Sequence, residues 1–308
     1  MSSIDIGRGI KTPIYLLKTK STPHDAYEEQ FSAPKDGVQF EPIFVPVLEH
    51  THLEEGMNFV RDVLHNKHIG LREGAKYGGM VFTSQRAVEA FAKLIAEGKG
   101  EEGWPYLQDV PIYAVGPATS RALKAILQNP PLNVLGETVN GEDLAHFMLD
   151  HYGELYKARS GKPPLLFLAG RQRRDIIPKT LMDPSLPSEQ RIPVDERVVY
   201  ETDVMRSFGQ NFSEKLEEVG NRGTRWVVVF SPTGCDAMLR ALFYLDPETH
   251  KYSPRIWDKD TTHIASIGTT TRDFLKNTFG FESDVCAAIP SPEGVDKGIM
   301  KFMSEQKG

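Results

Sequence analysis

The stretch Met80-Val81-Phe82-Thr83-Ser84, which runs on into Ala87-Val88-Glu89-Ala90-Phe91, decides how the rest of the chain is interpreted. A short apolar run, then hydroxyl residues, then apolar residues at helical spacing is typical of a β-strand, a helix N-cap and a helix. The stretch Val228-Val229-Phe230-Ser231-Pro232, followed by Ala237-Met238-Leu239-Arg240-Ala241-Leu242, has the same pattern about 150 residues later. This match indicates that the chain contains two similar halves.

Three further pairs of segments recur in the same order along the chain, so chance is a poor explanation. They are residues 13–17 (PIYLL) and 164–168 (PLLFL), residues 113–120 (YAVGPATS) and 265–271 (ASIGTTT), and residues 140–144 (NGEDL) and 291–295 (SPEGV). Each half alternates short strands with helical patterns, which is typical of a parallel sheet with helices on both faces. We therefore predict an α/β fold with two similar domains.

Two further strand-like segments are expected to lie outside the sheets that these repeated patterns form. They are residues 43–48 (IFVPVL) and residues 197–202 (RVVYET), and each lies between one sheet pattern and the next. We expect these two segments to pair as a two-stranded β ladder that joins the domains.

Open α/β sheets bind ligands outside the carboxyl ends of their strands, where helices begin. The hydroxyl residues at Thr83-Ser84, Thr119-Ser120, Ser231-Pro232-Thr233 and Thr270-Thr271 follow predicted strands. Ser and Thr side chains accept hydrogen bonds from first-turn N–H groups, so these residues are expected to cap helices. The fold class then predicts two rims of helix N-termini on either side of a cleft.

The composition is that of a globular protein, with 308 residues, 40% hydrophobic and 25% charged. No apolar run reaches the roughly 18–20 residues that span a bilayer, and the N-terminus lacks a basic region followed by an apolar stretch. We therefore expect no membrane segment and a cytoplasmic location. The two cysteines, Cys235 and Cys286, are interpreted as ordinary thiols.

The formal net charge of −6 argues against a nucleic-acid surface, which needs clustered positive charge. A local group of arginines and helix N-termini can still hold a small anion. The histidines in residues 50–52 (HTH) and 65–68 (HNKH) lack a carboxylate or cysteine partner at metal-site spacing, so no metal site is predicted. Glycine-rich phosphate loops and a GxSxG motif are missing, which disfavours nucleotide-binding and hydrolase functions.

Taken in order, the motifs resemble those of the uroporphyrinogen-III synthase family over residues 12–303. The matching segments are residues 81–89 (VFTSQRAVE), 113–119 (YAVGPAT), 166–174 (LFLAGRQRR), 198–202 (VVYET), 230–234 (FSPTG), 267–271 (IGTTT) and 290–292 (PSP). The chain departs from the family at Thr269, where many relatives have proline, and Gln85 occupies a variable position. No single motif is specific, but the ordered set is.

The resemblance implies a discontinuous first domain of residues 1–45 plus 201–308, and a second domain of residues 46–200. It also implies a monomer without metal or organic cofactor. The implied reaction is cyclisation of the small molecule hydroxymethylbilane to uroporphyrinogen III, with loss of water and inversion of ring D. Hydroxymethylbilane synthase is the expected source of the substrate, and no nucleic-acid or membrane partner is expected.

The implied site must hold a flexible chain of four pyrroles with eight carboxylates in one conformation, which is a problem of orientation. The resemblance matches Tyr200 to the family's linker-strand tyrosine, a phenol that can donate a proton to the departing hydroxyl group. The residues expected to bind the substrate's carboxylates are Thr83, Ser84, Arg86, Thr119, Arg171, Arg174, Ser231, Thr233 and Thr270.

Two other functions are considered beside this one. A non-catalytic two-domain receptor for an anionic ligand would share the duplicated α/β pattern and a two-strand hinge, but the missing signal-peptide pattern and the tyrosine in the hinge argue against it. A fused tetrapyrrole enzyme or regulator with a degenerate copy of the fold is disfavoured, because no segment is left over for a further domain. The simpler interpretation of Tyr200 is that it packs the strand, and that of the hydroxyl residues is that they are plain caps.

Overall fold

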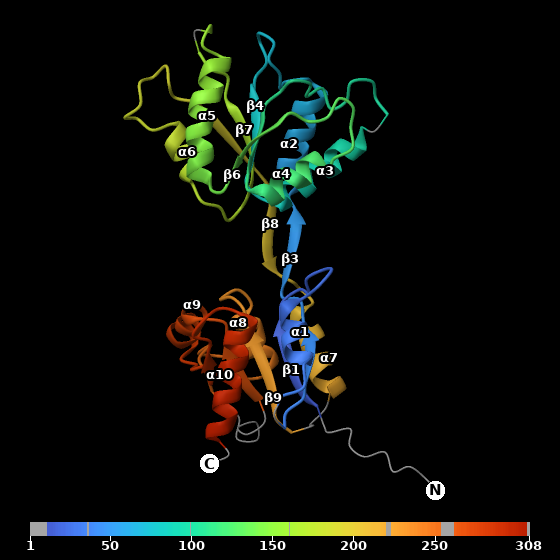
Figure 1. Cartoon of the computed structure of the whole chain (residues 1–308), viewed down its shortest axis with the longest axis vertical. Coiled ribbons are helices and arrows are strands. Elements are labelled where there is room, and N and C mark those ends of the chain that lie inside the picture. The colour runs from blue at the N-terminus through green and yellow to red at the C-terminus, as the bar shows by residue number, and fades with distance from the viewer. Residues whose placement is uncertain are drawn as a thin grey trace. The chain divides into compact units, whose positions relative to one another are not determined.

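The computed structural model forms two compact units. It describes residues 11–35, 37–98, 100–159, 161–219, 223–253 and 262–306. Unit 1 comprises Met1–Glu49 and Asp203–Gly308, and unit 2 comprises His50–Thr202. The chain passes from one unit to the other at strands β3 (Leu48–His52) and β8 (Val194–Val204), which are neighbours in one sheet (Figure 1).

The sheet of unit 2 has the strand order β3-β8-β7-β4-β5-β6. Besides β3 and β8, its strands are β4 (Gly79–Phe82), β5 (Ile112–Val115), β6 (Val134–Thr138) and β7 (Leu165–Gly170). The pairs β8-β7, β7-β4, β4-β5 and β5-β6 are all parallel. The helices of this unit are α2 (Glu54–His65), α3 (Gln85–Glu97), α4 (Pro117–Lys124), α5 (Gly141–Leu155) and α6 (Ile176–Leu181).

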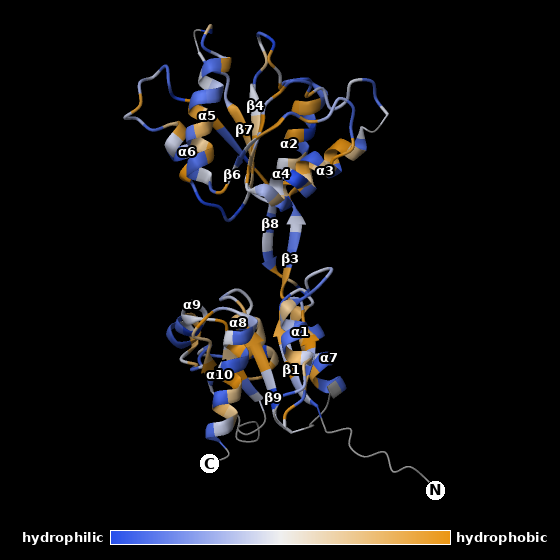
Figure 2. Ribbon diagram, in the orientation of Figure 1, coloured by the Kyte–Doolittle hydropathy of each residue, from blue (hydrophilic) through white to orange (hydrophobic). Residues whose placement is uncertain are grey.

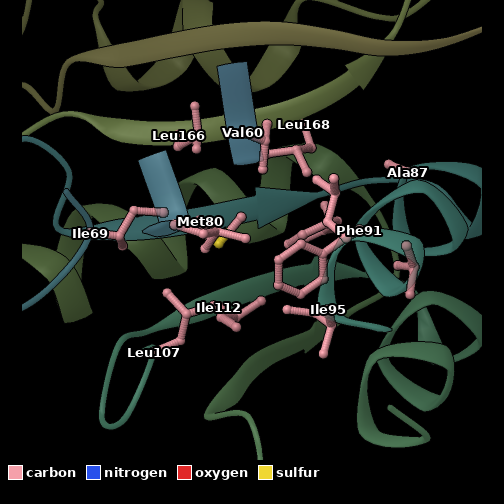
Figure 3. Packing of buried hydrophobic residues seen from close by; sticks show 14 of the residues in the cluster. Val60, Ile69, Met80, Ala87, Phe91, Ile95, Leu107, Ile112, Leu166 and Leu168 are labelled. Carbon is pink, nitrogen blue, oxygen red and sulfur yellow. The ribbon is translucent and has the colours of Figure 1, made fainter. Parts of the chain in front are cut away.

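Alternate side chains of the unit-2 strands enter two separate apolar cores, because successive residues of a strand point to opposite faces. Met80 and Phe82 pack with Phe91 and other residues of α2, α3 and α4, whereas Val81 packs with residues of α5 and α6. Figure 3 shows the first core around Met80, Phe91 and Leu168. In Figure 2 the central strands are coloured as hydrophobic, while the helices carry hydrophilic residues as well.

The sheet of unit 1 has the strand order β11-β10-β9-β1-β2, and all its pairs are parallel. Its strands are β1 (Thr12–Leu17), β2 (Phe40–Phe44), β9 (Arg225–Val229), β10 (Thr262–Ser266) and β11 (Val285–Cys286). Tyr15 packs with residues of α7 and α8, and Ile14 with residues of α1 and α10. The helices are α1 (Ala26–Ser32), α7 (Phe208–Val219), α8 (Cys235–Ala241), α9 (Thr269–Phe274), which continues as the π-helix η1 (Leu275–Phe279), and α10 (Pro292–Glu305).

The two sheets have equivalent strand orders, and the repeated sequence segments occupy equivalent places in them. Strand β1 of unit 1 corresponds to β7 of unit 2, and β2, β9, β10 and β11 correspond to β8, β4, β5 and β6. The equivalent strands of each sheet therefore comprise two strands from one half of the sequence and three strands from the other half, and the sheet of unit 2 has β3 in addition. The predicted α/β fold, with two similar, mostly parallel sheets flanked by helices, is confirmed. Strands β3 and β8 pair where the chain passes between the units.

The expectation that the two linker segments lie outside the sheets is wrong. In residues 43–48, Ile43 and Phe44 end β2, and Leu48 begins β3. Pro46 separates the two strands, since it has no N–H group to donate to a sheet. Residues 197–202 lie inside β8, whose earlier part pairs with β7 from Val194 onwards.

None of the helices in the described part of the chain is both long enough and apolar enough to cross a membrane.

Candidate functional site

The loops that follow the carboxyl ends of the parallel strands gather at one edge of each sheet, and we call this edge the rim of the unit. The rim of unit 2 follows β4, β5, β6 and β7 and carries Thr83, Ser84, Gly116, Asn140, Arg171 and Arg174. The rim of unit 1 follows β9, β10 and β11 and carries Ser231, Thr233, Gly268, Thr270 and Ser291. Each rim is the edge at which α/β sheets hold their ligands.

At the end of β4, the chain turns into α3 through two half-buried hydroxyl residues. Ser84 is the N-cap, and its Oγ accepts a hydrogen bond of 3.2 Å from the amide of Ala87. This confirms the capping role predicted for Ser84. Thr83 lies one residue before the cap. Because the cap satisfies only one of the first-turn N–H groups, others remain as donors at the rim.

After β5, the predicted cap at Thr119-Ser120 is wrong. Helix α4 begins earlier, at Pro117, and its N-cap is Gly116 with a φ of 79°. Glycine adopts this left-handed conformation without strain, and proline is suited to the first helical position. Thr119 therefore lies inside the helix with only 5% of its surface exposed, and its contact with a substrate stays a prediction.

Tyr200 lies on β8 beside the end of β7, where the pairing of the two strands shifts register. The amide of Arg171 donates a 3.0 Å hydrogen bond to the carbonyl oxygen of Tyr200. A Cβ atom on Gly170 would lie 2.5 Å from Cζ of Tyr200, so the ring lies directly against the glycine. The ring is half-buried against the core formed with α2 and α3, and its hydroxyl has no hydrogen-bond partner within the described residues.

The three predicted arginines of this rim differ in their partners. Arg86 forms an ion pair with Glu89 at 2.8 Å, and Arg171 forms one with Glu201 at 2.6 Å. Arg174 is exposed and has no ion-pair partner in the part of the chain that the structure describes. Of the three, Arg174 is therefore the cation whose charge is available to an anion without the loss of an existing pair.

His50, which is considered from the sequence only as a metal ligand and is rejected as one, lies beside this rim of unit 2. Its Nδ1 lies 2.8 Å from Oγ1 of Thr202, two residues beyond Tyr200. Burial and the positive charge of Arg86 hold the pKa of His50 below its ordinary value, against the opposing effect of Glu89. At neutral pH the imidazole is a neutral group. No pattern in the sequence indicates this position, since the predicted linker segment, residues 43–48, ends before it.

On the rim of unit 1, the capping roles predicted for Ser231 and Thr270 are wrong. Helix α8 begins after Gly234, whose φ is 93°, and α9 begins after Gly268. The hydroxyl of Ser231 instead donates to the carbonyl oxygen of Thr233 at 3.2 Å, and Thr270 lies exposed in the first turn of α9. Thr233 is exposed as well.

Two residues that do cap helices at the rims are not among the predicted caps. The side chain of Asn140 accepts from the amide of Asp143 at 2.9 Å, and that of Ser291 accepts from the amide of Gly294 at 3.1 Å. They begin α5 and α10, the longest helices of their units, at equivalent positions of the repeat. The sequence signal for both is the preference for Asn or Ser at an N-cap.

No arrangement of side chains for a metal ion is found in the described residues. Groups of three or more His, Cys, Asp or Glu side chains suited to a metal ion are absent there. Both cysteines are free thiols, and burial raises the pKa of Cys235 to about 12. What the two rims offer is hydrogen-bond donors, arginines and one half-buried phenol.

Comparison with known proteins gives consistent matches along nearly the whole chain. The family model described as "Uroporphyrinogen-III synthase HemD" matches residues 29–296. A uroporphyrinogen-III synthase of Saccharomyces cerevisiae is 32% identical over 291 residues, which is 92% of this chain and 94% of that protein. A uroporphyrinogen-III synthase of Schizosaccharomyces pombe is 30% identical over 293 residues, which is 94% and 97% of the two chains.

Among solved structures, a mutant uroporphyrinogen III synthase of the extremely thermophilic bacterium Thermus thermophilus matches 96% of this chain and 99% of its own. The sequence identity is 13% and the TM-score is 0.41.

Proposed function

The chain belongs to the uroporphyrinogen-III synthase family, and on that premise we propose how Tyr200 and the two rims carry out its reaction. It is a lyase of porphyrin and heme biosynthesis that cyclises hydroxymethylbilane to uroporphyrinogen III, with loss of water and inversion of ring D. The relatives favour this function, and nothing favours a non-catalytic anion receptor.

The reaction requires a proton donor and control of the conformation of the substrate. Hydroxide is a poor leaving group, so protonation or hydrogen bonding of the departing hydroxyl helps a pyrrole lone pair to expel it. The resulting azafulvene cation is attacked by the substituted carbon of the last ring, and the spiro intermediate fragments and recombines with that ring inverted. Closure without guidance gives the symmetric type I ring. Holding the polyanion in one conformation is therefore the larger part of the task.

Tyr200 is the proton donor in this proposal. Its ring is fixed against Gly170 and its carbonyl oxygen is held by the amide of Arg171, while its hydroxyl has no partner within the described residues. A phenol hydroxyl can donate a hydrogen bond to an oxygen of the substrate. The combination of a held ring and an unused hydroxyl is the observation that carries this assignment.

The rims hold the substrate's carboxylates. On unit 2 we assign this role to Thr83, Ser84, Arg86, Thr119, Arg171 and Arg174, and on unit 1 to Ser231, Thr233 and Thr270. First-turn N–H groups bear partial positive charge, which suits carboxylate oxygens. Arg174 contributes most among the arginines, because Arg86 and Arg171 must first give up their pairs with Glu89 and Glu201.

An assay of the product isomer tests the function directly. Freshly made hydroxymethylbilane is supplied to the protein, the products are oxidised, and the type I and type III isomers are separated. We expect predominantly the type III isomer. Formation of the type I isomer alone, at the rate seen without protein, would contradict the function.

The protein acts as a monomer in the cytoplasm and receives its substrate from hydroxymethylbilane synthase in this proposal. Two free cysteines are typical of a reducing compartment. The net charge of −6 is unsuited to a nucleic-acid partner. Light scattering of the purified protein tests the monomer, since a dimer would have twice the mass of one chain.

A further inference from the structure

A polar pocket lies in unit 2 at the edge of the sheet opposite to the rim. It has a volume of about 530 Å³ and is lined by the end of α5 and by the two segments that lead into the amino ends of β7 and β8. Small-molecule sites in proteins usually have volumes of roughly 300–1,000 Å³. The reaction proposed above makes no use of this pocket.

Four cationic side chains and one carboxylate line this pocket. The cations are Lys157, Arg159, Lys162 and Arg191, and the carboxylate is Glu189. Such a concentration of positive charge stands out in a chain whose net charge is −6. The pocket therefore favours a negatively charged ligand, although the molecule as a whole carries a negative charge.

Three of these cations bind main-chain carbonyl groups in place of carboxylates. Arg191 donates to the carbonyl oxygens of Leu186 at 2.9 Å and Pro184 at 2.6 Å. Arg159 donates to the carbonyl oxygen of Leu71, and Lys162 donates to that of Glu189. Within the described residues none of the three forms an ion pair, whereas Lys157 pairs with Glu154 at 2.6 Å.

These bonds fix the cations without neutralising them. The guanidinium carbon of Arg159 also lies 4.9 Å from the ring centroid of the buried Tyr156. A guanidinium has five N–H groups, and one or two carbonyl bonds leave the others to donate. Among the three, Arg191 has a further carboxylate near it, since its charge adds to the hydrogen bonds that lower the pKa of Asp183. Arg159, Lys162 and Arg191 are all half-buried, and a partly buried cation without an ion pair is unfavourable. An anion in the pocket would relieve this cost.

We propose that this pocket, the distal anion pocket, binds a small polyanion with clustered phosphate or carboxylate groups. Charge-assisted bonds from preoriented arginines are suited to the planar, bidentate contacts that such groups offer. The site is separate from the substrate-binding residues of the rim, so this inference stands independently of the proposed function.

Calorimetric titration of the full chain with inorganic triphosphate, and separately with citrate, tests the proposal at equal ionic strength. We expect at least one of the two to bind the wild-type protein, and which one binds decides between phosphate and carboxylate ligands. Arg191→Gln should raise the Kd by about tenfold or more. Added salt should weaken the binding, since partly exposed charges are screened.

Three variants make the result decisive. Lys162→Gln removes a pocket cation with a single surface bond, so it should weaken binding even if Arg191→Gln proves poorly folded. Arg240→Gln removes an exposed cation of unit 1 that pairs with Asp236, and it should leave the Kd unchanged. If binding is lost in Arg174→Gln but kept in Lys162→Gln, the anion binds at the rim and the proposal is wrong. It is equally wrong if neither anion binds the wild-type protein at millimolar concentration.

Discussion

At the scale of single residues, the position of the Tyr200 ring depends on the glycine beside it, Gly170. Gly170 has no side chain, and any Cβ atom there would lie 2.5 Å from the phenol ring. The main chain of β8 is held at the same place by the 3.0 Å bond from the amide of Arg171. A side chain held in this way loses little freedom when it meets a substrate, which favours proton donation in a fixed direction.

We predict that Tyr200→Phe lowers kcat by roughly tenfold to a hundredfold and leaves product affinity nearly unchanged, because the ring keeps its packing and only the proton donor is lost. Single-turnover assays of type III product, together with product titration, measure the two quantities. Tyr106→Phe is a matched control, since Tyr106 is another half-buried tyrosine whose hydroxyl has no hydrogen bond within the described residues. If both variants keep full turnover, Tyr200 only packs the strand.

We predict that Arg174→Ala weakens binding of the product by about tenfold. The reason is that this exposed cation forms no ion pair within the described residues, so its charge is available to a carboxylate of the product. Arg171→Ala should have a smaller effect, since Glu201 already balances Arg171. Fluorescence titration with the porphyrinogen product measures both affinities. Equal affinities for the wild type and Arg174→Ala would remove Arg174 from the site.

At the scale of elements, the sequence predicts which strands and helices form better than it predicts where each helix begins. The strand-to-helix pattern after β4, β5, β9 and β10 is present as expected. The hydroxyl residues near these turns suggest four caps, but Gly116, Gly234 and Gly268 precede α4, α8 and α9. The φ values of Gly116 and Gly234 are set by the turn geometry, and a pattern of residue types does not contain that information.

Helix α1 has a cap that is not among those predicted from the sequence. The carboxylate of Asp25 accepts from the amides of Tyr27 at 2.9 Å and Ser21 at 2.8 Å, and it forms an ion pair with Lys18. Burial alone would raise the pKa of Asp25, but Lys18 and the amides outweigh it and lower the pKa from 3.8 to about 2.

We therefore predict that Asp25 stabilises unit 1 by about 2 kcal/mol at neutral pH. Because the folded pKa lies below the unfolded one, this contribution is present above pH 3.8 and is lost as the pH falls through about 2. Denaturant unfolding of the wild type and Asp25→Asn between pH 2 and pH 7 measures it. The difference between the two proteins should shrink as the pH falls, and a constant difference would contradict the assignment. Glu55→Gln, a change of an exposed carboxylate, is the control.

At the scale of the whole molecule, the duplicated halves of the sequence are not the folded units. Strands β1 and β2 of the first half share a sheet with β9, β10 and β11 of the second, and β4, β5 and β6 share one with β7 and β8. Unit 2 is nevertheless one continuous segment, whereas unit 1 joins two segments that are far apart in the chain. The domain boundaries expected near residues 45 and 200 stay a prediction.

We predict that a fragment of residues 46–204 folds by itself, because it contains β3 to β8 complete and both apolar cores of unit 2. The first sequence half, residues 1–160, should not fold, since it has β4 without the parallel neighbour β7 that covers its other edge. Circular dichroism and thermal melting distinguish a cooperative transition in the first fragment from none in the second.

A fragment of residues 46–200 tests the predicted boundary, and its loss of cooperative melting would show that the end of β8 belongs to the folded unit. Cooperative folding of residues 1–160 would contradict the prediction for this fragment, because it would show that the first half of the sequence folds without strands from the second half.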